Sequence, residues 1–303
     1  MTVGSGRFTY ALDQSWGPSP DSGEWKNVVG IAVNSLDQVF VLSRAETPVR
    51  IFDQRGHLMT SWGEGVFTRP HGIHIGLDDS VYCADDKAHV VLKFTSDGHL
   101  VKTWGTPGVP SDTGYNGKDR STIKRGGLPF NRPTNSAVSP SGELYVSDGY
   151  GNARVHKFDA KGNYLLSWGE PGEGPGQFRV VHGVQVDRQG RVLVSDRENG
   201  RIQIFSPDGV FLAQWGDLDR PEEVDIDAED NVYVAEGFGR VSIFTLDGTL
   251  LARWGKDDGT QALAEEELHK IHALAIDSQG SIFVASQDYR ELGFVKKFAR
   301  LSS

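Results

Sequence analysis

The hydrophobic positions along this chain follow a period of two. Alternating or β-branched runs of about four to seven residues recur throughout, separated by Asp-Gly, Ser-Gly or Gln-Gly turns. No long stretch keeps the 3.6-residue period of an amphipathic helix. The pattern predicts an all-β protein.

Groups of four predicted strands recur about every 40 residues, the spacing of four-stranded propeller blades. A Trp-Gly pair closes most groups, at Trp16, Trp62, Trp104, Trp168, Trp215 and Trp254. The blades are expected at about 26–63, 68–105, 130–169, 178–216, 218–255 and 267–298. The last group lacks its own Trp-Gly, so residues 7–17 are expected to supply its outer strand. The sequence therefore predicts a single six-bladed β-propeller over residues 1–303, closed by its N-terminal strand, which removes exposed sheet edges.

The predicted connections between blades are longer than the turns within them. The longest, residues 106–129, carries several Lys and Arg residues among Gly, Ser and Pro. It is interpreted as a lid-like insertion, with an ordinary solvated loop as the alternative. Long loops on a rigid scaffold often carry function, so we expect the site at the mouth of the central channel on their face.

Composition narrows the possible partners. The net charge of −10 disfavours nucleic acid and anionic membranes, which need clustered Lys and Arg. No eighteen apolar residues run together, so we expect no membrane span. Cys83 is the single cysteine, and no charged segment followed by an apolar run opens the chain, so a cytoplasmic location is expected. The oligomeric state is left open.

Histidines recur at one position of the predicted inner strands, the first strand of each blade. Aligning these strands gives Val29, His71, Thr134, His182, Glu222 and His272. Blades two, four and six are related by about 120° in a sixfold ring. The three imidazoles therefore predict a trigonal zinc site with an open fourth position, the pattern of catalytic zinc. Separate hydrogen-bonded histidines are the alternative, and His269 is a possible substitute ligand at an awkward spacing.

The ends of the second strands predict another ring on the same face. Arg44 and Arg197 are candidates to hold a substrate carboxylate through paired hydrogen bonds. Tyr150 is a candidate base if a nearby cation or metal favours its phenolate. The aspartates that recur here, Asp85, Asp148 and Asp196, are expected to accept backbone N–H groups in turns.

Two motifs carry a family resemblance. Val-Ser-Asp-Gly-Tyr-Gly-Asn-Ala-Arg-Val (146–155) and Ser-Asp-Arg-Glu-Asn-Gly-Arg-Ile-Gln (195–203), with Asn-Arg-Pro or Gly-Gln-Phe before the inner strands, resemble the NHL-repeat propeller of peptidyl-α-hydroxyglycine α-amidating lyase. The similarity is sharp over about 75 residues of blades three and four, and is at the level of the repeat elsewhere.

The resemblance implies a zinc-dependent lyase. It assigns His71, His182 and His272 as zinc ligands, Tyr150 as the base, and Arg44 and Arg197 as the family's arginines. The implied reaction cleaves a carbinolamide C–N bond to give an amide and glyoxylate, with zinc as Lewis acid. The expected substrate is a small α-hydroxyglycine-like carboxylate.

The chain also departs from the family pattern. Ala273 replaces an acidic residue that helps to hold a structural calcium, so calcium is doubtful, and the family's paired cysteines are absent. Glu222, at the histidine level, is a possible fourth ligand or acid/base group. Another metal-dependent lyase or hydrolase that uses Glu222 or a zinc-bound water is therefore an alternative. A non-catalytic NHL binding module is a second, and a calcium-dependent lactonase-type propeller a weaker third.

Overall fold

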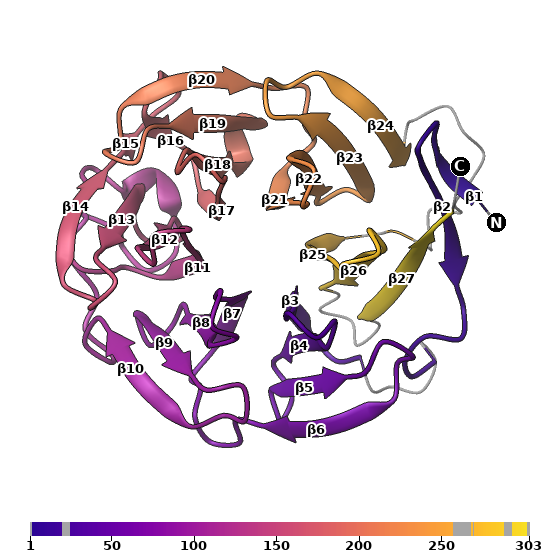
Figure 1. The fold of residues 1–303 in the computed structure, drawn as a ribbon. Coiled ribbons are helices and arrows are strands. Elements are labelled where there is room, and N and C mark those ends of the chain that lie inside the picture. The colour runs from indigo at the N-terminus through magenta and orange to yellow at the C-terminus, as the bar shows by residue number, and fades with distance from the viewer. Residues whose placement is uncertain (1, 20–24, 257–267, 269, 288–292, 302–303) are drawn as a thin grey trace. The chain divides into compact units, whose positions relative to one another are not determined.

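The computed structural model describes residues 2–19, 25–256, 268, 270–287 and 293–301. The described residues form a six-bladed β-propeller, which confirms the predicted fold class (Figure 1). Contacts divide the chain into two compact units, Gly65–Pro221 and Met1–Glu64 with Glu222–Ser303. Within the described residues, no helix is long and apolar enough to cross a membrane.

The Gly65–Pro221 unit contains blades two, three and four, each a four-stranded antiparallel sheet. Their strands are β7 (Pro70–Ile75), β8 (Val81–Asp85), β9 (Val90–Phe94) and β10 (Leu100–Trp104); β11 (Pro133–Val138), β12 (Leu144–Asp148), β13 (Arg154–Phe158) and β14 (Tyr164–Trp168); and β17 (Val181–Val186), β18 (Val192–Asp196), β19 (Arg201–Phe205) and β20 (Phe211–Trp215). The connections add the short parallel strands β15 (Glu170–Pro171) and β16 (Gln177–Phe178) and the 3₁₀ turns η2 (Arg120–Thr122) and η3 (Arg197–Asn199).

The other unit contains blades one, five and six. Their strands are β3 (Val28–Val33), β4 (Val39–Ser43), β5 (Val49–Phe52) and β6 (Leu58–Trp62); β21 (Pro221–Ile226), β22 (Asn231–Glu236), β23 (Arg240–Thr245) and β24 (Leu250–Gly255); and β25 (Ile271–Ile276), β26 (Ile282–Ser286) and β27 (Phe294–Arg300) with β1 (Thr2–Ser5) and β2 (Phe8–Asp13).

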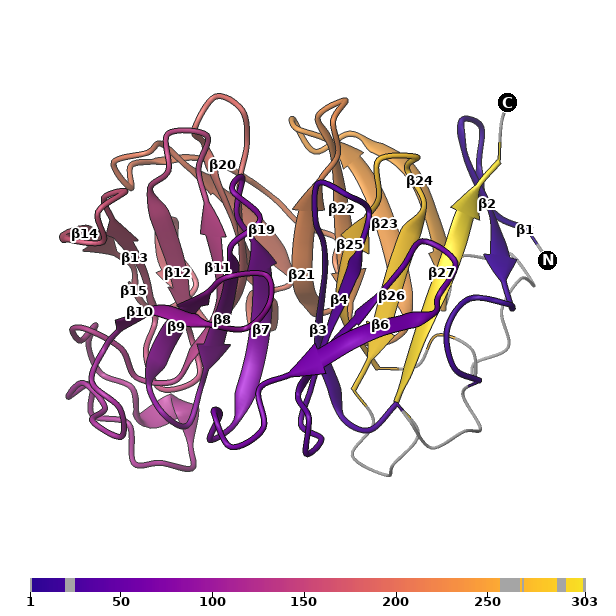
Figure 2. The same ribbon diagram turned by 60° about the horizontal axis from the view of Figure 1, so that its bottom comes forward.

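The N-terminal segment completes the sixth blade, as the sequence predicted. Strand β2 pairs antiparallel with β27, with Tyr10 opposite Arg300, and Figure 2 shows the two strands side by side. Strand β1 adds a fifth strand, which was not predicted. Trp16 lies beyond the end of β2, where its ring packs against Phe283 at 5.0 Å between ring centroids. Two distant parts of the sequence are therefore joined by a hydrogen-bonded sheet.

Burial explains why the period of two is uneven along the chain. All five residues of β8, β12 and β18 are buried, because sheets pack against both faces of these middle strands. The outer strands β6 and β20 have mostly exposed side chains. In the Gly65–Pro221 unit, one core cluster joins Tyr145 and Val155 of blade three to Val184 and Val194 of blade four. Full burial of each aliphatic side chain in such a core stabilises the fold by about 1.5–3 kcal/mol.

His74 on β7 generates a prediction about pH and stability. Its Nε2 accepts a hydrogen bond from the Val138 backbone N–H at 3.1 Å, and burial lowers the pKa of His74 from 6.5 to about 4. Below pH 6.5 the unfolded chain therefore binds a proton that the folded chain does not, so stability falls as pH decreases from 6.5 to about 4. His74→Gln keeps an acceptor but does not titrate. We expect urea denaturation of this variant to show a smaller loss of stability across that window.

His57→Gln is the matched control, since the His57 side chain is 72% exposed. It should leave the pH dependence of unfolding close to that of the parent protein. The same pH dependence of the free energy of unfolding in the His74 variant and the parent protein would contradict the lowered pKa of His74.

Candidate functional site

The residues aligned from the sequence occupy one structural position. Val29, His71, Thr134, His182, Glu222 and His272 are each the second residue of the inner strand of their blade. In five of these strands the pairing register shifts across this residue, which marks a β-bulge. A bulge bends its strand and re-aims the side chain it carries. The repeat therefore sets the direction of each of these side chains through the backbone.

The backbone before the inner strands is also repeated. Five of the six inner strands follow directly on a residue with positive φ, namely Asn27, Arg132, Val180, Arg220 and Lys270. Val180 has φ 71°, a conformation that costs a β-branched residue energy and persists only where the surroundings hold it. The hydrogen bond from the Arg197 N–H to the Val180 carbonyl, at 3.0 Å, is one such restraint.

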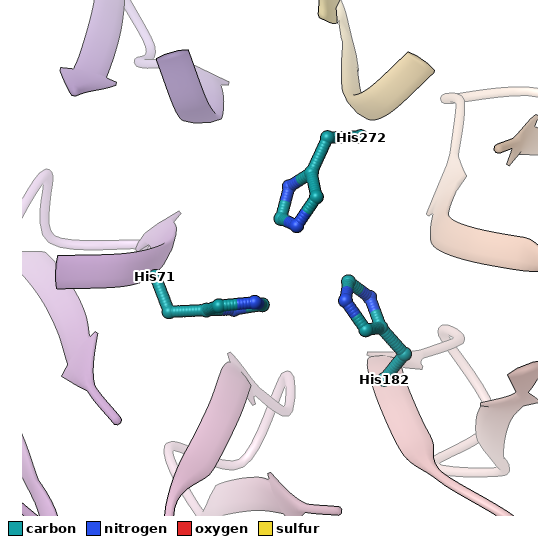
Figure 3. Close-up of side chains that lie close together, drawn as sticks. All are labelled: His71, His182 and His272. Carbon is teal, nitrogen blue, oxygen red and sulfur yellow. The ribbon is translucent and has the colours of Figure 1, made fainter. Parts of the chain in front are cut away.

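His71 and His182 lie together in the Gly65–Pro221 unit. Their side chains are 1% and 2% exposed, and their ligand nitrogens lie within 4.8 Å of each other (Figure 3). The Tyr150 hydroxyl lies between them, 2.9 Å from Nε2 of His71 and 3.0 Å from Nε2 of His182. One phenol oxygen is thus shared by two imidazoles.

A backbone hydrogen bond fixes the orientation of the His71 ring. Nδ1 of His71 donates to the Thr134 carbonyl on the inner strand of the next blade, at 2.8 Å. In a neutral imidazole this donation leaves the lone pair on Nε2, the nitrogen that faces Tyr150. Metal-binding histidines are typically held in this way by their other ring nitrogen.

His272, in the other unit, repeats the arrangement. Its Nδ1 donates to the Val29 carbonyl at 2.8 Å, and its side chain is 6% exposed. Val29 and Thr134 occupy the same position of their inner strands, so the acceptor is also repeated. A neutral imidazole with its lone pair on Nε2 is the form of histidine that binds zinc, so His71 and His272 suit zinc.

Guanidinium groups surround the Tyr150 ring. Those of Arg120, Arg132 and Arg197 lie 4.6, 5.6 and 5.5 Å from its centroid. Nη1 of Arg197 is 3.4 Å from the Tyr150 hydroxyl oxygen. Cations at these distances stabilise negative charge on a phenol oxygen.

Glu198 fixes Arg197 in this cluster. Its carboxylate accepts from Nε and Nη2 of Arg197 at 3.1 and 2.8 Å, while Arg197 is only 5% exposed. Burial raises the pKa of Glu198, but Arg197 and Arg220 lower it more, so the net shift is downward. The turn η3 that holds both residues ends at Gly200 in the left-handed conformation.

The 106–129 insertion is fastened to blade three. The Thr113 hydroxyl donates to the Gly151 carbonyl at 2.6 Å, and the Asn131 amide donates to the Ser111 carbonyl at 2.9 Å. Its turn η2 brings Arg120 over Tyr150. The sequence shows that this insertion is rich in Lys and Arg, but it does not place Arg120, or Arg132 before β11, in the site. The excess of Arg in the insertion was the available signal.

The predicted role of the three aspartates is confirmed. Asp85 accepts backbone N–H groups of Thr68 and Arg69, at 2.6 and 3.0 Å. Asp148 and Asp196 accept those of Asn131 and Arg179, each at 2.8 Å. These carboxylates hold the chain that enters β7, β11 and β17.

The structure bears differently on three further candidates from the sequence, Arg44, Glu222 and His269. Arg44 follows β4 and is partly exposed, with its backbone N–H donating to the Asn27 carbonyl at 3.1 Å. Glu222 is 5% exposed on β21 and lies against Gly237, where an added Cβ would meet its carboxylate at 2.7 Å. Both belong to the unit that contains His272, and their roles stay predictions. His269 lies outside the described residues.

Comparisons define the class of protein as an NHL-repeat β-propeller that resembles the amidating lyases. The model of the NHL repeat family matches residues 178–205, within blade four. A solved structure of a streptogramin B lyase has a TM-score of 0.65 over 97% of this chain and 99% of that chain, at 14% identity. That similarity shows the fold alone.

Two curated relatives are similar to this chain over more than half of its length. NHL repeat-containing protein 3 of Mus musculus is 33% identical over 221 residues, which are 68% of this chain and 59% of the relative. Peptidyl-alpha-hydroxyglycine alpha-amidating lyase 1 of Drosophila melanogaster is 31% identical over 185 residues, 57% of this chain and 32% of the relative. The matches thus span less than two thirds of either relative. The Drosophila relative is named as a lyase, and the mouse relative is named only by its repeat.

Gly149 generates a prediction about how the site is positioned. A Cβ at Gly149 would lie 2.1 Å from the Val181 carbonyl oxygen and 2.4 Å from its nitrogen. Gly149→Ala therefore forces apart the segments that carry Tyr150 and His182. We expect it to lower the free energy of unfolding by about 1–3 kcal/mol, the usual cost of overpacking, in urea denaturation.

Gly216→Ala is the control, because its Cβ would meet only the Gly200 oxygen at 3.5 Å, an ordinary contact. A Gly149 variant as stable as the Gly216 variant would contradict this prediction, because it would show that the two segments move apart at little cost in free energy.

Proposed function

We propose that this protein is a zinc-dependent lyase that cleaves the C–N bond of an α-hydroxyglycine-type carboxylate. The observation that carries the proposal is the place of the Tyr150 hydroxyl, 2.9 and 3.0 Å from the Nε2 atoms of His71 and His182 that would bind zinc, and beside Arg197. A phenol among imidazoles and guanidinium groups suits proton abstraction from a hydroxyl. The resemblance to amidating lyases supports the same reaction.

The proposed zinc ligands are Nε2 of His71, His182 and His272. Their common place in the repeat and the matching Nδ1 hydrogen bonds of His71 and His272 support this set. Three imidazoles leave a fourth position open, the pattern of catalytic zinc. A zinc ion held there would supply Lewis-acid stabilisation of the substrate's hydroxyl oxygen.

Side chains of this protein are proposed to transfer the proton of the carbinol hydroxyl. Tyr150 accepts the proton of the carbinol hydroxyl, with Arg120, Arg132 and Arg197 stabilising its phenolate. The electron pair of that O–H bond forms the new C=O bond, and the C–N bond breaks. The same proton then passes to the departing amide nitrogen. The products are an amide and glyoxylate, so atoms and charge balance.

The substrate carboxylate is proposed to bind Arg197 and Arg44. Arg197 is buried and held by Glu198. Its side chain is therefore already ordered before the substrate binds, so binding costs less conformational entropy. Arginine donates two parallel hydrogen bonds to a carboxylate, which also fixes its orientation. A carboxylate held in this orientation would direct the hydroxyl group of the substrate toward Tyr150.

A second candidate is a metal-dependent lyase or hydrolase with Glu222 as its base. It is favoured by the burial of Glu222 at the strand position that the histidines occupy in other blades. In that case Glu222→Gln, and not Tyr150→Phe, abolishes turnover. A non-catalytic binding module is the alternative from another class, and it predicts no turnover.

Glyoxylate release from N-benzoyl-α-hydroxyglycine tests the proposal. We expect turnover by the zinc-loaded protein and a fall in kcat of about 10²–10⁴-fold in Tyr150→Phe, the usual contribution of a general base. The Phe variant keeps the ring and loses only the hydroxyl.

Tyr164→Phe is the matched control, since Tyr164 lies on the outer strand β14 and is 46% exposed. It should retain full activity. Full activity of Tyr150→Phe would reject tyrosine as the base, and no glyoxylate from the parent protein would reject the lyase.

A further inference from the structure

Asp86 directly follows β8, the second strand of blade two, and its side chain is 0% exposed. Arg44 and Arg197 occupy the same position after the second strands of blades one and four. The repeat therefore places a buried carboxylate where these two blades carry a candidate substrate-binding arginine. A buried carboxylate is costly unless cations and hydrogen-bond donors compensate it. Its burial also keeps it from touching a substrate, so it can act on the site only through the residues that it binds.

Two arginines hold the Asp86 carboxylate. Its Oδ2 accepts from Nη1 of Arg69 at 2.7 Å and from Nη2 of Arg132 at 3.2 Å. The backbone N–H of Asp86 also donates to the Arg69 carbonyl at 3.2 Å. Arg69 directly precedes β7, and Arg132 directly precedes β11. One carboxylate therefore ties together the starts of two neighbouring inner strands.

These two strands carry both partners of the hydrogen bond that orients the His71 ring. His71 is the second residue of β7, and Thr134 is the second residue of β11. The Thr134 carbonyl accepts from Nδ1 of His71 at 2.8 Å. Arg69 and Arg132 each lie two residues before one of these partners. A tie between the two arginines therefore limits how far the donor and the acceptor can separate.

Arg132 also contacts Tyr150. Its guanidinium lies 5.6 Å from the Tyr150 ring centroid, and its carbonyl accepts from the Tyr150 backbone N–H at 3.4 Å. The φ of Arg132 is 67°, a conformation that a residue other than glycine keeps only where its surroundings hold it. Its backbone N–H donates to Nδ1 of His89 at 3.1 Å, and its Nη1 donates to the Tyr115 hydroxyl at 3.2 Å. The position of Arg132 against Tyr150 thus depends on restraints at both its backbone and its side chain.

Charge makes Asp86 the strongest of the side-chain restraints on Arg132. Burial lowers the pKa of Arg132, but the Asp86 carboxylate and the Tyr115 hydroxyl raise it more, so the net shift is upward. A hydrogen bond between two ionised groups is about twice as strong as one between neutral groups. Removing the charge of Asp86 removes the counterion that Arg69 and Arg132 share.

We infer that Asp86 is a positioning residue of the site. Through Arg69 and Arg132 it holds the starts of β7 and β11 together. The His71 ring is thereby kept against its carbonyl acceptor, and Tyr150 against Arg132. The effect on turnover rests on the proposed function, whereas the effect on the His71 ring needs neither metal nor substrate.

Asp86→Asn in the metal-free protein tests the inference, because it keeps the size of the side chain and removes its charge. NMR of protein labelled with ¹⁵N-histidine follows solvent exchange of the His71 Nδ1 proton, which reports how often its hydrogen bond opens. His71→Gln identifies the resonance. We expect exchange at least about tenfold faster in Asp86→Asn, the size of change that coupling within a salt-bridge network produces.

Asp187→Asn is the matched control. Asp187 is 2% exposed and pairs with Nε of Arg191 at 2.6 Å, in the turn between β17 and β18 of the same unit. The control therefore also removes the charge of a buried carboxylate that binds an arginine, but beyond the end of β17 that is opposite His182. It should leave the exchange of the His71 proton unchanged.

Arg132→Gln releases one side of the tie from the opposite partner, and it decides the question if Asp86→Asn does not fold. It should speed exchange of the His71 proton as well. Parent-like exchange in a folded Asp86→Asn variant, or in Arg132→Gln if only that variant folds, would overturn the inference. Equal acceleration in Asp187→Asn, or a His71 proton that already exchanges rapidly in the parent protein, would also overturn it.

Turnover separates this inference from the proposed function. In the zinc-loaded protein, Asp86→Asn should lower kcat for N-benzoyl-α-hydroxyglycine about 10–100-fold, the usual effect of losing a residue that supports metal ligands. KM should change less, because Glu198 still holds Arg197. A kcat equal to that of Asp187→Asn would overturn the positioning role.

The two failures have different signatures. Faster exchange in Asp86→Asn, without turnover by the parent protein, would support the positioning of His71 and reject the lyase. Turnover by the parent protein, with exchange unchanged in Asp86→Asn, would overturn the positioning role and leave the lyase standing.

Discussion

The hydrogen bond from a histidine Nδ1 to the carbonyl of a neighbouring inner strand joins the fold of this protein to its chemistry. It occurs at His71 with Thr134 and again at His272 with Val29, each at 2.8 Å. Thr134 and Val29 occupy the same position of their inner strands, so the repeat places the acceptor in both blades. The bond sets both the direction of the ring and its tautomer, and it directs Nε2 away from the backbone. A buried imidazole held in this way costs little further ordering when it binds a metal.

Backbone geometry makes that hydrogen bond possible. The inner strands carry a bulge at the histidine position, and the recurring aspartates hold the chain that enters several of them. The site therefore depends on features that also determine the fold, such as Gly149, which admits the backbone of Val181. Tyr150, Arg197 and Glu198 are then added where the blades differ. The repeat supplies positions, and departures from the repeat supply the reactive groups.

The propeller, the closing strand and the common histidine position could be predicted because each has a signal within the repeat. The strand period, the Trp-Gly endings and the recurrence of histidine are local patterns that survive without an alignment. Arg120 and Arg132 could not be assigned to the site, because their contact with Tyr150 depends on how a long insertion folds over blade three. The fifth strand β1 was missed because it lies outside the four-strand repeat and pairs with β2 alone, at the edge of the sheet. Arg44 and Glu222 were predicted from the repeat, and their roles depend on chemistry that no pattern specifies.

Metal content tests the central claim most directly. Elemental analysis of the protein purified after zinc loading and dialysis should give close to one zinc per chain. Each of His71→Ala, His182→Ala and His272→Ala should lose it, while His57→Ala, which changes an exposed histidine, should retain it. Zinc bound equally by the parent protein and all three site variants, or by none of the proteins, would contradict the account.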